Sequence, residues 1–361
     1  MSGDALNKGA QNLLFGCGEF AAGEHVLIVC EDPALGWYDE AAPLAVASEA
    51  RRAGITVEML TTRAIAAGED AATDTAVSSA ENLIYFARLG DRSRFEAGPS
   101  GQRAVMSYAM DAPLLASPYG TTPYAATKAL KGAIDRALFG ASQITVTCPL
   151  GTMVTGDAGD AAPDGADVTV RRFPLGVPTP IPAARFCGHV ALARYLTPTG
   201  SSVYEPASLS LPSPVLAEIR DGRISTFTGE EHVVEAVTAH YRSVADRFCI
   251  DPAAVHSFHA GFHNGFAYRH AADDDPDRWS NTVFTSPRTL HFHTCGAYAP
   301  GEICWMVIDP TVAVDGVALW EGGVFRPARH GTTAAVLERY PELRLLCNAP
   351  AGALGLPPAP R

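Results

Sequence analysis

The stretch His25–Asp32, HVLIVCED, is a short apolar run that is rich in β-branched residues and ends on acidic residues before Pro33. The next segment, Asp39–Gly54 (DEAAPLAVASEARRAG), is rich in alanine, has helical spacing and ends on a glycine. Ile55–Thr62 (ITVEMLTT) again has the pattern of a strand. Strands that alternate with helices predict a parallel sheet with helices on its faces.

This alternation continues through Ala80–Leu89 (AENLIYFARL) and Gly101–Met110 (GQRAVMSYAM) to a strong helical pattern at Thr122–Ala141. No GxGxxG follows the first strand, so the sequence does not support a dinucleotide site. We therefore predict an α/β chain whose N-terminal domain, residues 1–142, is Rossmann-like with a parallel sheet.

The character of the sequence changes after Ala141. Gln143–Asp160 (QITVTCPLGTMVTGDAGD) has the pattern of strand, turn and strand, and Ser201–Gly229 is β-rich with a turn at RDGR. Glu230–Phe248 predicts one helix. These patterns predict a second domain, residues 143–361, of the mixed α+β class. The histidines of this domain, considered below, make it the expected catalytic metal-binding domain.

Composition excludes several classes of partner. The chain has 361 residues, enough for about two domains, and a formal net charge of −12, which argues against nucleic acid or an anionic membrane surface. No stretch approaches the ~20 apolar residues of a membrane span, and the N-terminus lacks the features of a signal peptide. The eight cysteines form no CxxC pair. They therefore predict reduced thiols in a cytoplasmic protein without a structural zinc knuckle.

Histidines are concentrated in one region, since seven of the eleven lie between His240 and His293. His291 and His293 are separated by one residue in TLHFHT, a segment with the β-branched and aromatic residues of a strand. On a strand, residues i and i+2 point to the same face, so these two imidazoles can bind one ion. We take His259, in a predicted glycine-containing loop (FHAGFHNG), as the third ligand. Three neutral imidazoles leave positions open for substrate or O₂, which is typical of a catalytic site.

The other histidines have simpler interpretations. We expect His256, His263 and His270 to be half-buried side chains with one hydrogen bond each, and His263 is the exception that we consider as an acid–base residue. The remaining five are expected to be surface or capping residues: His25, His189, His232, His240 and His330.

Two further segments contain candidate ligands. A hydroxyl of Thr285 or Ser286, in VFTSPRT, could bind a metal or a substrate oxygen, while the alternative is a strand end followed by a proline turn. The acidic run Asp273–Asp277 lacks the spaced ligands of a calcium loop, so we expect a solvated surface turn.

The order of these segments resembles the thermophilic aminopeptidase (M29-like) superfamily. The resemblance rests on ITVTCPLGTMVTG, LPSPVLAEIRDGRISTFTG, the helix that follows, and then FHAGFHNG, VFTSPRT and LHFH. Within this superfamily the chain is more similar to the 2,5-dihydroxypyridine 5,6-dioxygenases, which hold one ferrous ion with a His, a Ser and an Asp. Their His matches His259, their Ser falls at Thr285 or Ser286, and their Asp matches His293.

The departures from the family pattern favour one metal ion. The peptidases hold two ions and have acidic ligands just before the FTSP-like segment, where this chain has Asn281 and Thr282. The dioxygenases also use a histidine of the N-terminal domain, and in this chain Arg88, Asp91 or Arg92 would take its place.

The resemblance implies a mononuclear non-haem iron(II) oxygenase that acts on a small hydroxylated aromatic or heteroaromatic substrate with O₂, in a homo-oligomer. The N-terminal domain would supply contacts from one or more of Tyr108, Met110, Tyr119 and Tyr124. The alternatives are a zinc-dependent hydrolase related to the aminopeptidases, since three histidines also suit zinc, and a degenerate member that only binds a small molecule or a partner.

Overall fold

A computed structural model describes the chain at residues 3–94, 99–162, 169–200 and 204–356. The chain forms two compact units that alternate along the sequence, Met1–Lys128 with Gly165–Leu175 and Ala129–Asp164 with Gly176–Arg361. The boundary predicted between residues 142 and 143 falls inside the first stretch of the second unit, and the chain then returns once to the first unit.

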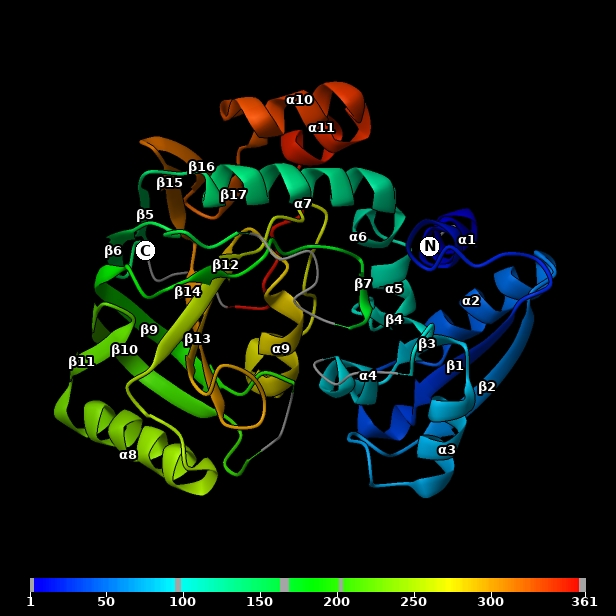
Figure 1. Ribbon diagram of the computed structural model, residues 1–361, viewed down its shortest axis with the longest axis horizontal. Helices are drawn as coiled ribbons and strands as arrows, with labels where there is room; N and C mark the ends of the chain where they lie inside the picture. The colour runs from blue at the N-terminus through cyan, green and yellow to red at the C-terminus, as the bar shows by residue number, and fades with distance from the viewer. Residues whose placement is uncertain (1–2, 95–98, 163–168, 201–203, 357–361) are drawn as a thin grey trace. The chain divides into compact units, whose positions relative to one another are not determined.

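The first unit contains a five-stranded sheet in which every pairing is parallel, in the order β2-β1-β3-β4-β7. Its strands are β1 (His25–Glu31), β2 (Thr56–Thr62), β3 (Asn82–Phe86), β4 (Arg103–Ser107) and β7 (Arg171–Phe173). All residues of β1 after His25 are buried, which explains why the HVLIVCED stretch is continuously apolar rather than alternating. The predicted α/β class with an N-terminal parallel sheet is therefore confirmed (Figure 1).

Helices connect these strands. The helical segments of the first unit are α1 (Gly3–Gln11), the π-helix η1 (Asn12–Cys17), the 3₁₀ turn η2 (Pro33–Leu35), α2 (Ala41–Arg52), α3 (Ala71–Ser79), α4 (Arg88–Ser93), α5 (Ala112–Leu115) and α6 (Pro118–Thr121). Gly54 has a φ of +79°, a left-handed conformation that glycine adopts without strain, and it lets the chain leave α2 and enter β2.

The second unit contains a large curled antiparallel sheet (Figure 1). The main path of the sheet has the order β17-β16-β15-β5-β6-β9-β14-β13-β12-β8, and β10 pairs with both β9 and β11. Its strands are β5 (Ile144–Thr147), β6 (Met153–Gly156), β8 (Ile181–Pro182), β9 (Cys187–Thr197), β10 (Leu209–Arg220), β11 (Arg223–Thr228), β12 (Val255–Ala260), β13 (Thr289–Cys295), β14 (Glu302–Ile308), β15 (Thr311–Val314), β16 (Val317–Glu321) and β17 (Val324–Phe325).

The hairpin of β10 and β11 confirms the turn predicted at RDGR. Asp221 and Gly222 both have a positive φ, 48° and 69°, as the tight turn of a two-residue hairpin requires. The strand, turn and strand predicted after residue 143 are β5 and β6, which pair with each other. Of the predicted β-rich stretch 201–229, residues 201–203 lie outside the described part of the chain.

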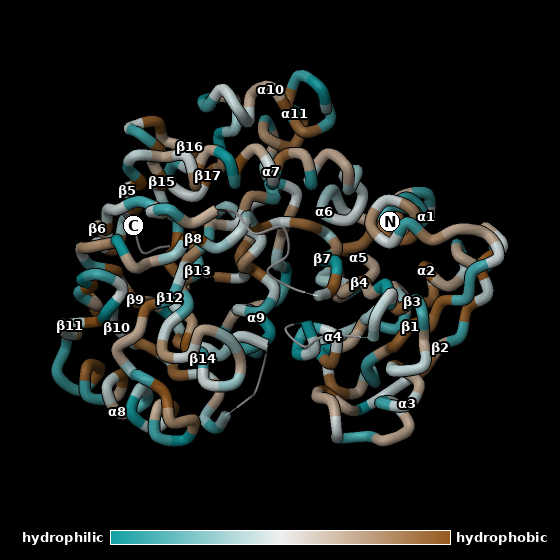
Figure 2. The backbone as a smooth tube through the Cα atoms, in the orientation of Figure 1, coloured by the Kyte–Doolittle hydropathy of each residue, from teal (hydrophilic) through white to brown (hydrophobic). Residues whose placement is uncertain are grey.

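The remaining helices are α7 (Tyr124–Phe139), α8 (Glu231–Phe248), the 3₁₀ turn η3 (Ala272–Asp274), α9 (Pro276–Val283), the 3₁₀ turn η4 (Pro327–Arg329), α10 (Gly331–Arg339) and α11 (Pro341–Asn348). Helix α8 packs on β10 and β11, and it buries Val233, Val237, Tyr241 and Val244, which share one helical face. Its hydrophilic and hydrophobic residues therefore alternate along the tube in Figure 2. No described helix combines the length and the apolar character that crossing a membrane would require.

An aromatic stack holds the centre of the large sheet. The rings of Phe258 on β12 and Phe292 on β13 are stacked with centroids 4.8 Å apart, and the ring of Trp305 on β14 lies 5.5 Å from that of Phe292. All three side chains are at most 1% exposed. Buried aromatic contacts of this kind tie three neighbouring strands together.

Replacing Phe292 with alanine should lower the free energy of unfolding by about 3–5 kcal/mol, because the change leaves a cavity in this stack. Phe292→Leu should lose less, since it keeps an apolar side chain in the site. Leu345→Ala, at a side chain that is 72% exposed, is the control and should change stability by at most about 0.5 kcal/mol. Denaturant unfolding measures all three, and a near-neutral Phe292→Ala would show that the stack does not stabilise the sheet.

Candidate metal centre

The pairing of β12 with β13 brings the three predicted histidines together. The strands are antiparallel, and His259 of β12 lies directly opposite His291 of β13. His293 lies two residues further along β13, so its side chain points to the same face as that of His291. The strand predicted for TLHFHT is confirmed. The predicted loop position of His259 is wrong, because strand β12 continues through His259 to Ala260.

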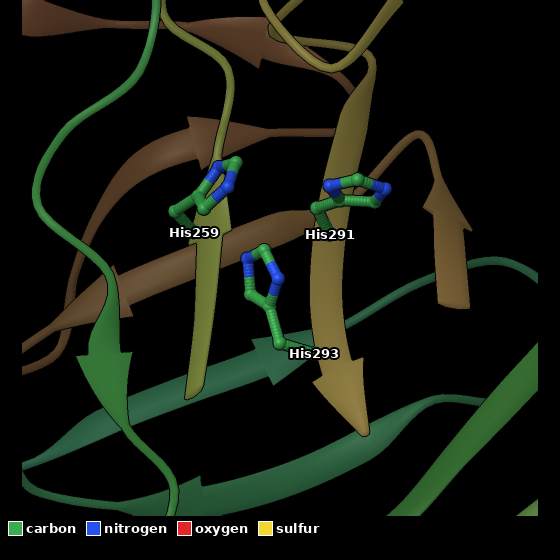
Figure 3. A group of neighbouring side chains, drawn as sticks. All are labelled: His259, His291 and His293. Carbon is green, nitrogen blue, oxygen red and sulfur yellow. The ribbon is translucent and has the colours of Figure 1, made fainter. Parts of the chain in front are cut away.

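The three imidazoles lie close together in front of the two strands (Figure 3). Their ring centroids are separated by 5.6 Å for His259 and His291, 5.1 Å for His259 and His293, and 5.4 Å for His291 and His293. One ring nitrogen from each lies within 4.8 Å of the others. Metal–nitrogen bonds of about 2.1 Å need these nitrogens roughly 3–4 Å apart, so small ring rotations suffice to close the site on one ion.

Burial and orientation favour metal ligation by His293. His259 and His291 are each 5% exposed, and the side chain of His293 is 12% exposed. Nδ1 of His293 donates a hydrogen bond to the carboxylate of Glu302, the first residue of β14. Within the described part of the chain, the buried Nε2 of His293 has no hydrogen-bond partner. Nε2 is therefore the nitrogen that His293 has available for a metal.

An aromatic side chain borders the cluster. The ring of Phe284 lies 6.3 Å from that of His291 with an interplanar angle of only 13°, and 6.4 Å from that of His259. Phe258 and Phe292 alternate with the histidines along the same strands and belong to the aromatic stack on the other face. The pleat of the two strands thus separates a histidine face from an apolar core face.

Thr285 and Ser286 follow the end of helix α9, so the interpretation of this segment as a strand end is wrong. The hydroxyl of Ser286 is fully buried and accepts a hydrogen bond from the backbone N–H of Arg288 at 3.3 Å. The Thr285 hydroxyl donates to the carbonyl of Thr282 at 3.4 Å. Asn281 also lies on this helix and donates to the carboxylate of Asp277. Asp277 is buried, whereas Asp273 and Asp274 are exposed, so the predicted solvated turn is confirmed at the start of the acidic run and wrong at its last residue.

His263 lies beside Thr285. Its backbone N–H donates to the Thr285 carbonyl at 3.0 Å, and its Nδ1 accepts from the backbone N–H of Gly265 at 3.2 Å. A Cβ atom at Gly176 would approach Cβ of Thr285 to 2.6 Å and Cβ of His263 to 3.3 Å, so the close packing here requires glycine. Burial lowers the pKa of His263 to about 3. The ring therefore stays neutral near neutral pH, with its proton on Nε2.

In the first unit, two of the proposed stand-in residues belong to buried ion pairs. Arg88 pairs with Glu31 at 2.8 Å and lies over the ring of Trp37 at 4.5 Å. Asp91 pairs with Arg94 and accepts a hydrogen bond from the Tyr108 hydroxyl at 2.6 Å. The predicted contact residues Met110 and Tyr119 are almost fully buried, as is Tyr108, and Arg92 and Tyr124 are partly buried.

Glu302 and Cys304 were not predicted as candidate ligands from the sequence. With His293 they form a second group whose ligand atoms lie within 4.8 Å of one another, and both are 1% exposed. The available signal was a glutamate at the start of the otherwise apolar strand EICWMVI, because a charge in a buried strand needs a specific partner.

Neither a protein-family model nor a curated protein matches the chain. Among solved structures, the 2,5-dihydroxypyridine dioxygenase from Pseudomonas putida KT2440 matches with a TM-score of 0.59 and 13% identity, over 92% of this chain and 99% of that one. Wild-type AmpT from Thermus thermophilus matches with a TM-score of 0.51 and 14% identity, over 89% of this chain and 99% of that one. The chain shares their fold.

The predicted similarity to the M29-like aminopeptidases and to the pyridine dioxygenase is thus confirmed at the level of structure. Identities of 13% and 14% establish the fold alone, so the activity has to be argued from the chemistry of the site.

Replacing either His259 or His291 with alanine should weaken the binding of Co²⁺ or Zn²⁺ by more than ~100-fold. The change removes a metal ligand itself, which costs more than the loss of a residue that is hydrogen-bonded to a ligand. The wild-type chain should retain one ion after gel filtration. His189→Ala, at an exposed histidine of β9, is the matched control and should retain it too. Elemental analysis and competition titration measure these values. Full metal content in His259→Ala would contradict the assignment.

Proposed function

We propose that this protein is a mononuclear non-haem iron(II) oxygenase that acts on a small hydroxylated aromatic or heteroaromatic substrate, as a ring-cleaving dioxygenase does. The observation that carries the proposal is the cluster of His259, His291 and His293 on one face of two paired strands. The fold shared with a 2,5-dihydroxypyridine dioxygenase, over 92% of the chain, supports this class of reaction.

The donor set fits one divalent transition-metal ion. Imidazole suits iron, zinc, copper and nickel, and three such ligands leave coordination positions open for a substrate and O₂. A bound ion would satisfy the buried Nε2 of His293, which has no hydrogen-bond partner among the described residues. The two groups of candidate ligands share His293, which supports a single ion rather than two separate ones.

Iron held by the three histidines would supply Lewis acidity and redox chemistry with O₂. The residues around it would bind and orient the substrate. Phe284, nearly parallel to the His291 ring, offers an apolar surface beside the cluster that suits a flat aromatic ring. The same ring would keep bulk water from the histidine face, which strengthens polar interactions with the substrate.

For proton transfer we propose His263 together with a hydroxyl of Thr285 or Ser286. These groups lie in neighbouring segments that are joined by the hydrogen bond from His263 N–H to the Thr285 carbonyl. Burial lowers the pKa of His263 to about 3, so it would act as a neutral imidazole that donates from Nε2 or orients a hydroxyl. An imidazolium general acid at neutral pH does not agree with this pKa.

A zinc-dependent hydrolase is the second candidate. Three histidines with an open fourth position form a common catalytic zinc site, and zinc-bound water can attack an amide. The fold shared with AmpT supports this alternative. Metal identity and the requirement for O₂ separate the two functions.

The protein is loaded with Fe²⁺ under anaerobic conditions and then transferred to buffer that contains O₂. It should consume O₂ when 2,5-dihydroxypyridine or a catechol is added, because both compounds offer adjacent or conjugated oxygens to a metal. His291→Ala should lose more than ~100-fold of this rate, and His189→Ala should keep it. An oxygen electrode measures the consumption of O₂, and the ultraviolet spectrum of the substrate measures the loss of its aromatic ring.

Two results would contradict the oxygenase. The first is a purified protein that carries zinc, cleaves amides and consumes no O₂. The second is an iron-loaded protein that consumes O₂ equally well after His291→Ala, which would place the reaction away from the cluster.

A further inference from the structure

Glu302 is a buried charged residue in an apolar strand. It begins β14 and is 1% exposed, while the rest of that strand is built from apolar residues such as Ile303 and Trp305, which are fully buried. Burying a carboxylate without compensation costs several kcal/mol. Its position therefore indicates a specific interaction rather than a chance placement.

Among the described residues, the carboxylate of Glu302 lies against the imidazole of His293. The Glu302 carboxylate accepts the hydrogen bond from Nδ1–H of His293. The two residues lie on neighbouring strands, since β13 pairs with β14 in a register that places His293 opposite Cys304 and Cys295 opposite Glu302. The contact is thus fixed by the sheet itself, as the contact between His259 and His291 is.

This hydrogen bond determines which ring nitrogen of His293 is free of its proton. A neutral imidazole carries one proton, so donation from Nδ1 leaves a lone pair on Nε2. The ring of His293 extends toward those of His259 and His291 (Figure 3). A carboxylate behind a ligating histidine also makes the ring a stronger donor and restricts its rotation.

We propose that Glu302 is a positioning residue of the metal centre, which acts through His293. It holds His293 in the tautomer that binds metal and brings a negative charge next to a cluster of three neutral ligands. The inference rests on the proposed metal site, but it does not depend on which reaction that site catalyses.

The competing interpretation is direct ligation. Glu302, Cys304 and Nδ1 of His293 could together hold an ion on the other side of the imidazole. In the structure Nδ1 is already hydrogen-bonded to Glu302, and the Cys304 thiol contacts the Thr199 hydroxyl at 2.6 Å. These contacts favour a positioning role, and the two interpretations differ in what Cys304 should do.

The test is Co²⁺ binding by the full-length protein, followed by competition titration and by the visible spectrum of the bound ion. Glu302→Gln should weaken Co²⁺ binding by ~10–100-fold, as the loss of a carboxylate behind a ligating histidine does. The bound fraction should keep the spectrum of the wild type. Cys304→Ala should bind Co²⁺ with wild-type affinity, and the wild type should lack the charge-transfer band of a thiolate ligand.

Nitrogen-15 NMR of the histidine rings in the Zn²⁺-bound wild type gives a second readout that needs no Glu302 variant. His293 should show a proton on Nδ1 and metal-bound Nε2, with its signal assigned by comparison with a His293→Gln protein. The opposite tautomer would overturn the proposal even if Glu302→Gln fails to fold.

Wild-type affinity in Glu302→Gln would also overturn it, as would a thiolate band together with loss of binding in Cys304→Ala. These failures are distinct from failure of the oxygenase. Weakened Co²⁺ binding in Glu302→Gln, combined with no O₂ consumption by the iron-loaded wild type, would support the positioning role of Glu302 and contradict the oxygenase reaction. Wild-type Co²⁺ affinity in Glu302→Gln, combined with O₂ consumption by the iron-loaded wild type, would contradict the role of Glu302 and support the oxygenase reaction.

Discussion

The register between β12 and β13 is the constraint on which the candidate site depends. It places His259 opposite His291 and leaves His293 on the same face, one pleat further along. A slip of one residue would turn the histidines of one strand into the core and its phenylalanines out to the site. The aromatic stack of Phe258, Phe292 and Trp305 opposes such a slip, because the stack stabilises only the register in which these rings are in contact. The core therefore specifies the geometry of the metal centre.

Local patterns were sufficient for much of the fold. Three elements could be predicted because their structure depends on residues that are adjacent in sequence, and all three predictions are confirmed. They are the strand at His25–Asp32, the turn at RDGR and the strand at TLHFHT. The position of His259 was predicted incorrectly, since the glycine that follows Ala260 looked like part of a loop that already included the histidine. The partnership of His293 with Glu302 could not be predicted, because it is formed across two strands through sheet register.

The chemistry of the cluster follows from what surrounds it. On one side Phe284 provides an apolar surface, and on the other Glu302 provides a buried negative charge behind His293. This charge lies next to ligands that are themselves neutral, which favours a divalent cation. The arrangement suits one ion with open positions, whereas the fold itself is compatible with both an oxygenase and a hydrolase, as the two matching structures illustrate.

The most direct test of the metal centre is a crystal structure of the protein loaded with Fe²⁺ under anaerobic conditions, with anomalous diffraction recorded at the iron edge. We expect one anomalous peak per chain, bounded by Nε2 of His293 and the rings of His259 and His291. A peak between Glu302 and Cys304, two peaks in one chain, or no peak at the histidines would contradict it.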